Sequence, residues 1–157
     1  MSDDEGMSMQ FGFLGINYKK ADLNIRDIVS FTDQKKMDFL KKADQRGICQ
    51  CMVLSTCNRS EIYFFSEEKN SIEKMRDLFQ DTFPQIDLSE YMIMKIGEDA
   101  VSYLFCIAAG LESMVLGEDQ ILGQVKDALD FSRTMGSSGK QLNKVVRDAV
   151  TCAKKSK

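Results

Sequence analysis

Histidine is absent from the 157 residues of this chain, and the sequence has neither a basic leader nor a long apolar run. Histidine is the usual general base near neutral pH and the commonest metal ligand, so any chemistry here must use other side chains. A membrane helix needs about 18 consecutive apolar residues, which the sequence does not contain. The first residues, MSDDEGMSMQ, are acidic where a secretory or transit peptide would be basic. We therefore expect a cytoplasmic protein without a membrane segment.

The five cysteines form an odd set in a chain of ordinary size, so we expect no disulfide framework and a reducing compartment. The net charge of −3 argues against a protein that binds nucleic acid through a basic surface over its whole extent. Residues 138–157 nevertheless contain six lysines and arginines against one aspartate, Asp148. This segment is either a local basic patch or a solvated helix face.

The length of the chain, with 43% apolar and 29% charged residues, suits one domain with a sizeable core. We expect residues 1–9 to be a disordered acidic start and residues 10–157 to form that domain. No internal repeat or low-complexity tract divides it.

Strands are predicted in four segments, at 11–17, 49–55, 61–65 and 91–96, from their apolar, β-branched and aromatic residues. The first has apolar side chains on both alternating faces, as in a strand buried on two sides. Asp33 can cap a helix that runs to about Ala43. Apolar residues at spacings of three and four predict another helix over 71–83, which Pro84 ends. The order strand, helix, strand, strand, helix, strand is the split βαβ arrangement of ferredoxin-like folds.

From Gly97 onward the apolar residues follow a helical period in three successive stripes, which lie within 101–111, 121–129 and 142–150. The glycine-rich turn at 136–139 is a short helix connection. The sequence therefore predicts an α+β protein, a βαββαβ sheet followed by about three helices.

Cys57 lies in the loop TCNRS, at the end of a predicted strand and among polar residues. The nearby guanidinium of Arg59 favours a thiolate over a thiol, and no apolar neighbour follows until Ile62. Free cysteines are usually small buried apolar residues, and we assign that role to Cys106, Cys152 and at least one of Cys49 and Cys51. The setting of Cys57 instead predicts a nucleophile.

Three of the cysteines, Cys49, Cys51 and Cys57, could alternatively bind a metal. Structural zinc sites usually show paired C-x₂₋₄-C spacings and four ligands, and no histidine is present to complete a set. We therefore predict no metal.

A second group of polar residues lies in the segment 110–128, GLESMVLGEDQILGQVKDA. A helix stops at Gly110, and a new helix is predicted to begin near Gly117. Gln120 and Gln124 are four residues apart and share one face of that helix, while Glu118 lies in its first turn. These residues fit either helix capping at the surface or close contact with a polar ligand.

Both motifs, together with GINYKKADLNIRD near the start, resemble the N-terminal catalytic domain of the glutamyl-tRNA reductase family, from about Phe13 to Lys155. The resemblance implies that the Cys57 thiolate attacks the ester of glutamyl-tRNA and forms a glutamyl thioester. A hydride from NADPH then releases glutamate 1-semialdehyde, in the five-carbon route to 5-aminolevulinate and tetrapyrroles. The family is an NADPH-dependent oxidoreductase that forms homodimers at full length.

The positions that line the family's glutamate pocket correspond here to Thr56, Asn58, Arg59, Ser113, Glu118, Asp119, Gln120 and Gln124. Arg59 suits a substrate carboxylate because its planar fork binds both oxygens. Tyr103 stands where the family usually has a histidine, and we expect it to act there as a weaker catalytic proton donor. Tyr18 replaces a common histidine, and Asp119 replaces a frequent proline.

NADPH needs a site that this chain lacks, because no G-x-G-x-x-G follows a strand. We therefore expect NADPH to be bound by a separate domain and the chain by itself to reduce nothing. The partners that the resemblance implies are glutamyl-tRNA and glutamate-1-semialdehyde aminotransferase. Two alternatives remain open, a thiol hydrolase that releases glutamate from glutamyl-tRNA and a non-catalytic tRNA-binding module.

Overall fold

The computed structural model describes residues 9–111 and 120–155. The predicted disordered start falls almost wholly outside these residues. Three predicted pocket residues, Ser113, Glu118 and Asp119, also lie outside them.

A single antiparallel sheet runs through the middle of the molecule, with the strand order β2-β3-β1-β4. Its strands are β1 (Gln10–Asn17), β2 (Gln50–Thr56), β3 (Arg59–Ser66) and β4 (Ile93–Ile96). This is the order of the split βαβ arrangement, so the predicted fold class is confirmed.

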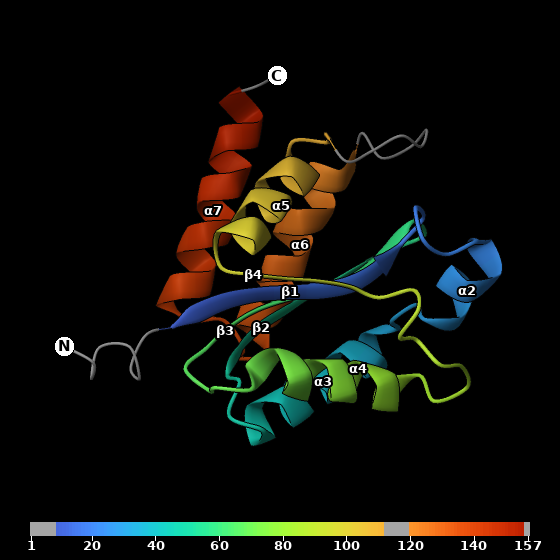
Figure 1. Ribbon diagram of the computed structural model, residues 1–157. Coiled ribbons are helices and arrows are strands. Elements are labelled where there is room, and N and C mark those ends of the chain that lie inside the picture. The colour runs from blue at the N-terminus through green and yellow to red at the C-terminus, as the bar shows by residue number, and fades with distance from the viewer. Residues whose placement is uncertain (1–8, 112–119, 156–157) are drawn as a thin grey trace.

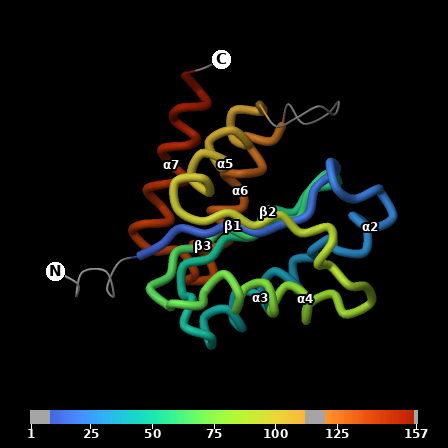
Figure 2. The backbone as a smooth tube through the Cα atoms, in the orientation of Figure 1, coloured from blue at the N-terminus to red at the C-terminus, as the bar shows by residue number. Residues whose placement is uncertain are grey.

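Helices cover both faces of the sheet (Figure 1). They are α2 (Leu23–Ile28), α3 (Asp33–Gln45), α4 (Ser71–Thr82), α5 (Glu98–Ala108), α6 (Ile121–Thr134) and α7 (Lys140–Lys155). One face packs against α3 and α4, and the other against the predicted group of three, α5 to α7 (Figure 2). No helix in the described part of the chain is long and apolar enough to cross a membrane.

Strand β1 supplies apolar side chains to both layers of the core. Leu14 and Ile16 join the cluster under α3 and α4, whereas Phe11 and Phe13 join the cluster under α5 to α7. Side chains alternate between the two faces of a strand, so a run of apolar residues fills both layers. The predicted two-sided burial of this strand is confirmed.

Two helix ends test the predictions made from the sequence. The prediction that Asp33 caps α3 was wrong, because the N-cap is Thr32, whose hydroxyl oxygen accepts from the backbone N–H of Lys35 at 3.1 Å. Gly110 adopts a φ of 79° just after α5, a conformation that favours glycine, and it ends the helix as predicted. The short helix α2 was not predicted, since none of its six residues is fully buried and its contact with the core comes from the partly buried Ile25.

Candidate functional site

Cys57 lies at the tip of the hairpin formed by β2 and β3. The predicted loop is shorter than expected, because Thr56 and Arg59 are paired in the strands and only Cys57 and Asn58 form the turn. Cys57 is exposed, whereas Asn58 is buried. The strand register therefore presents this one thiol at the end of the sheet.

The turn is held by residues from two other segments. The backbone N–H of Tyr18, just after β1, donates to the carbonyl oxygen of Asn58 at 3.0 Å. Arg26 in α2 donates from Nε to the carbonyl oxygen of Cys57 at 3.2 Å. Within the turn, the N–H of Asn58 donates to Oγ1 of Thr56 at 3.1 Å. The segment that contains Tyr18 and Arg26 thus holds the carbonyls of both turn residues, Cys57 and Asn58.

Arg26 is a residue that the sequence interpretation missed. Its Nη1 also donates to the carbonyl oxygen of Ala21 at 2.8 Å, which fixes the guanidinium beside the turn. The only available signal was its place in the motif GINYKKADLNIRD. A guanidinium hydrogen-bonded at the Cys57 carbonyl brings a positive charge to the thiol's own residue.

The other cysteine of this hairpin, Cys51, lies in different surroundings. Cys51 is in the core under α3 and α4, where burial raises the pKa of its thiol. Cys57 is six residues further along, about 20 Å for an extended strand. Among the residues that the structure describes, no three acidic or cysteine side chains gather as metal ligands.

The side chain of Arg59 is buried and pairs with Glu61. Its Nη1 lies 2.9 Å from Oε2 of Glu61, and both side chains are fully buried. The ring of Tyr18 lies 6.0 Å from the guanidinium carbon. The charge predicted to favour the Cys57 thiolate is thus shared with a buried carboxylate.

Glu61 accepts hydrogen bonds from two tyrosines as well as from Arg59. Tyr63 donates to its Oε1 at 2.8 Å, and Tyr103 of α5 donates to its Oε2 at 2.7 Å. Asn17, the last residue of β1, donates from Nδ2 to the Tyr103 hydroxyl at 3.0 Å. We call Asn17, Arg59, Glu61, Tyr63 and Tyr103 the buried polar network.

Burial controls the protonation of this network. It raises the pKa of the Glu61 carboxyl, while the charge of Arg59 and the hydrogen bonds from its donors oppose the rise. Burial, and then the Glu61 charge, also raise the pKa of Tyr63 and of Tyr103. Both phenols therefore remain protonated at neutral pH, in agreement with their role as donors.

Tyr103, the predicted proton donor, is engaged inside the network. Its hydroxyl donates to Glu61 and accepts from Asn17, and Lys95 lies 5.8 Å from the centre of its ring. Among the described residues, Tyr103 and Cys57 form no hydrogen bond with each other. The structure connects the two through Glu61 and Arg59, and also through Asn17 and Tyr18, which holds the turn.

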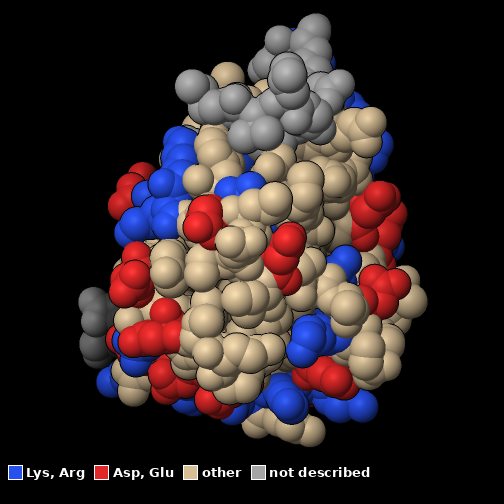
Figure 3. Space-filling model, turned by 90° about the vertical axis from the view of Figure 1, so that its right-hand side faces the viewer, with Lys and Arg blue, Asp and Glu red and all other residues tan. Residues whose placement is uncertain are grey.

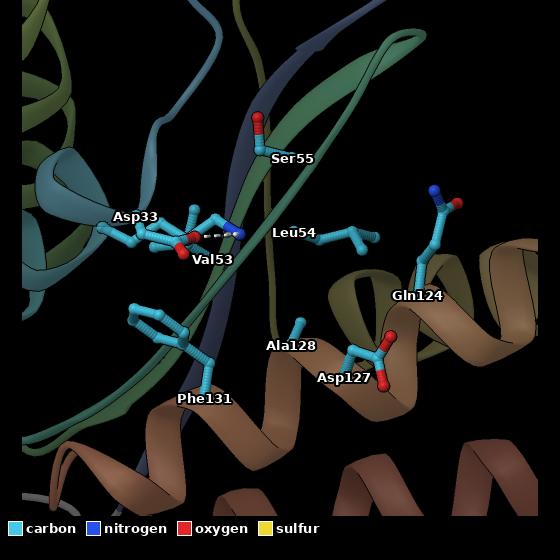
Figure 4. Close-up of a pocket in the computed structure, with 9 residues that line it drawn as sticks. Asp33, Val53, Leu54, Ser55, Gln124, Asp127, Ala128 and Phe131 are labelled. Carbon is cyan, nitrogen blue, oxygen red and sulfur yellow. Dashed lines mark ion pairs between the residues drawn. The ribbon is translucent and has the colours of Figure 1, made fainter.

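A groove of about 310 Å³ runs along the free edge of β2 (Figure 4). Its walls come from α3, β2 and α6. Ser55, two residues before Cys57, lines its end on β2, and Gln124 extends from α6 toward the turn end of the hairpin. Asp33 and Lys36 form an ion pair of 3.8 Å on the opposite wall. The groove contains apolar and polar surface side by side, as small-molecule sites do.

The structure brings together some of the predicted residues and separates others. Thr56, Cys57, Asn58 and Arg59 meet at the hairpin turn, while Gln124 lies in the groove. Gln120 is exposed at the start of α6 and does not line the groove.

Comparisons with known proteins agree on one family. The family model described as Glutamyl-tRNAGlu reductase, N-terminal domain, matches residues 14–157. A glutamyl-tRNA reductase of Clostridium novyi is 43% identical over 150 residues, which cover 95% of this chain and 36% of that protein. One from Geobacillus thermodenitrificans is 38% identical over 151 residues, covering 94% and 33%.

Among solved structures, glutamyl-tRNA reductase from Methanopyrus kandleri superposes with a TM-score of 0.76 at 32% identity. The match covers 92% of this chain and 33% of that one. The chain thus spans about a third of the length of the proteins that it matches.

Proposed function

The chain belongs to the glutamyl-tRNA reductase family as its N-terminal domain, and from this membership we propose that Cys57 accepts the glutamyl group of glutamyl-tRNA. The observation that carries the proposal is the position of Cys57, exposed at a two-residue turn whose backbone Tyr18 and Arg26 hold in place. A nucleophile must be both accessible and fixed in direction, and this turn provides both.

The proposed step is an acyl transfer. The Cys57 thiolate attacks the carbonyl carbon of the ester that joins glutamate to the terminal ribose of the tRNA. A carbon–sulfur bond forms, the bond between the carbonyl carbon and the ribose oxygen breaks, and that oxygen takes up a proton. The products are a glutamyl thioester on Cys57 and free tRNA.

In this proposal Arg59 recognises the substrate carboxylate. A guanidinium presents its N–H donors in a fixed plane that matches the two oxygens of a carboxylate, as in its contact with Glu61. Thr56 and Asn58 shape the turn around the acyl group. Tyr103 is proposed as a proton donor, and its hydrogen bond to Glu61 would have to be exchanged for one to the leaving oxygen.

Gln124 is proposed to contact the aminoacyl end of the substrate from the groove, since it is the amide that α6 directs toward the turn end of the hairpin. Gln120 is proposed as an outer contact. Ser113, Glu118 and Asp119 remain proposed pocket residues on the strength of the family motif.

NADPH does not fit the residues described here. Dinucleotides bind at the carboxyl ends of parallel strands, beside a glycine-rich loop that opens a helix. The sheet of this chain is antiparallel throughout its described strands, and the sequence has no G-x-G-x-x-G after a strand. We propose that this domain's part ends at the thioester. The reduction to glutamate 1-semialdehyde would then belong to an NADPH-binding domain of the whole family protein.

Recognition of the tRNA body is proposed to rest on local contacts. Figure 3 shows the side of the molecule that carries α2, where acidic and basic side chains alternate around a broad uncharged area. The helix α7, whose lysines and arginine are exposed, lies on the opposite side of the molecule from α2 in Figure 1. Such contacts can bind the tRNA phosphates even though the described residues form no large positive region that would attract the tRNA from a distance.

We further propose a cytoplasmic location and glutamate-1-semialdehyde aminotransferase as the partner that takes the product.

Intact-mass spectrometry tests the acyl transfer directly. We expect incubation of the chain with glutamyl-tRNA to add one glutamyl mass, and Cys57→Ala to abolish that addition. Cys49→Ala is the matched control, because Cys49 is also exposed but lies before β2, at the other end of the hairpin. An adduct that survives Cys57→Ala, or no adduct at any pH, would overturn the proposal. Release of free glutamate from the adduct would show that the isolated domain acts as a thiol hydrolase.

A further inference from the structure

We propose that Glu61 is a positioning residue, which orients Arg59 toward the substrate carboxylate from inside the fold. The inference rests on the proposed function, because it assigns Glu61 a part in recognising the same glutamyl group. Glu61 was not among the residues predicted from the sequence.

The geometry around Glu61 is that of a fixed anchor. Its side chain is fully buried, and three donors occupy its two oxygens, Arg59 and Tyr103 on Oε2 and Tyr63 on Oε1. These donors come from both β3 and α5, so rotation of the carboxylate would break bonds to two elements at once. A guanidinium paired with such a carboxylate has little freedom of its own.

Contacts from the network lead back to the turn that bears Cys57. Tyr103, bound to Glu61, accepts from Asn17, and the next residue, Tyr18, holds the carbonyl of Asn58. Arg59 follows Asn58 directly in the chain. Glu61 is therefore linked to the turn along two routes, through β3 itself and through α5 and the end of β1.

Stability alone is a poor explanation for this arrangement. The desolvation of a buried ion pair offsets much of its Coulomb attraction, and well-packed apolar residues are often as stable in its place. Apolar side chains of Phe11, Phe13 and Leu54 already fill this layer of the core. The Glu61 carboxylate, at the substrate end of the sheet, fixes the direction of the Arg59 guanidinium.

Glu61→Gln tests the proposal, since it keeps the size of the side chain and removes its charge. Acylation of Cys57 is measured with glutamyl-tRNA and with the same tRNA charged with glutamine, whose neutral amide replaces the carboxylate. The preference is the ratio of the acylation rate with glutamyl-tRNA to the rate with the glutamine-charged tRNA. We expect the native chain to prefer glutamate. We expect Glu61→Gln to lower this ratio at least about tenfold, because a misdirected Arg59 no longer contacts the carboxylate well. Iodoacetamide carries no carboxylate for Arg59 to bind, so the rate at which it alkylates Cys57 should stay within about twofold.

Ser132→Ala is the control for lost stability, because Ser132 is buried and donates to the carbonyl of Cys51 on the same hairpin, away from the turn. Tyr63→Phe is the second variant, and it removes one donor from Glu61 while keeping the ring. If Glu61→Gln does not fold, Tyr63→Phe tests the proposal in its place, and we expect it also to lower the preference for glutamate.

The outcomes separate the two proposals. A native chain that is not acylated overturns the proposed function, and the inference falls with it. Acylation with an unchanged preference in the folded variants overturns the inference alone. A Glu61→Gln chain that loses acylation and whose preference or alkylation rate changes no differently from that of Ser132→Ala also overturns it, because a general loss of stability would then explain the result.

Discussion

Gly15 of β1 lies directly opposite Glu61 of β3, and the absence of a side chain at Gly15 leaves the space that the Glu61 side chain fills. A Cβ at position 15 would lie 2.7 Å from Cγ of Glu61 and 2.8 Å from the carbonyl oxygen of Ser60. The second of these atoms belongs to the backbone and cannot move aside cheaply. The buried carboxylate of Glu61 therefore depends on a glycine in the neighbouring strand.

Gly15→Ala is expected to destabilise the protein by about 1–3 kcal/mol, because the added methyl overpacks the sheet. Urea unfolding monitored by circular dichroism measures the change. Gly123→Ala is the control, since nothing lies within 4 Å of a Cβ there and the residue is inside α6. A helix interior favours alanine by roughly 0.5–1 kcal/mol, so this variant should be slightly more stable than the native chain. Equal effects of the two substitutions on stability would contradict the claim that Gly15 is needed to leave space for the Glu61 side chain.

Thr32 and Asp33 are expected to differ in their effect on α3. Thr32→Ala removes the side-chain acceptor for the N–H of Lys35 and should cost about 1 kcal/mol. Asp33→Ala removes only an exposed ion pair with Lys36, at 3.8 Å, and a favourable charge in the first turn, so about 0.5 kcal/mol is expected. Urea unfolding of both variants decides which residue caps the helix. A larger loss in the free energy of unfolding for Asp33→Ala would contradict Thr32 as the N-cap.

The layered fold was predictable because its signals are local. A strand with apolar residues on both faces requires cover on both sides, and three apolar stripes after Gly97 supply one of those layers. The helix α2 escaped prediction because it is six residues long and packs against the core through the partly buried Ile25, a weak signal in the sequence. Thr32 was passed over in favour of its neighbour, since both are good N-cap residues and only the backbone angles separate them.

The candidate site was predictable only in part. The turn residues are adjacent in sequence, so Thr56, Cys57 and Asn58 could be recognised together. The buried polar network joins residues far apart in the chain, because the residue numbers of Asn17 and Tyr103 differ by 86 and those of Glu61 and Tyr103 differ by 42. The one local signal was a carboxylate at the head of an apolar strand, EIYFF, and a charge there is costly unless it is paired.

Alkaline pH is expected to destabilise the fold through Tyr63 and Tyr103. Burial raises the pKa of both above the value of about 10 for an unfolded tyrosine. Below about pH 10 both states are protonated and the stabilising contribution is fully present. Above about pH 10 the unfolded chain loses protons that the folded chain keeps, so stability falls as pH rises.

Each of these tyrosines lowers the free energy of unfolding by up to about 1.4 kcal/mol for each pH unit above about pH 10. Urea unfolding at several values between about pH 9 and 12 measures the slope. The double variant Tyr63→Phe with Tyr103→Phe should have a shallower slope than the native chain. An unchanged slope would show that neither phenol is protected from ionisation in the fold.

Arg26→Ala is expected to slow acylation of Cys57 with a modest loss of stability. The substitution removes the donor to the Cys57 carbonyl and should loosen the turn. It also removes the hydrogen bond to the Ala21 carbonyl, and each of the two bonds is worth about 0.5–1.5 kcal/mol. Arg46→Ala is the matched control, because Arg46 also donates to a backbone carbonyl, that of Lys74, at 3.5 Å and away from the turn. If both variants acylate at the native rate, Arg26 does not hold the thiol in its reactive position.

Gln124→Ala tests whether the groove receives the aminoacyl end of the substrate. The residue is half-buried and lines the groove, so loss of its amide should remove one hydrogen bond to the ligand and slow acylation about two- to tenfold. Stability should change by no more than about 0.5 kcal/mol, because alanine suits a helix. Lys126→Ala is the control, as Lys126 is exposed on the same helix and does not line the groove. Slower acylation in both variants would implicate the charge or stability of α6, whereas a loss confined to Gln124→Ala places the substrate beside β2.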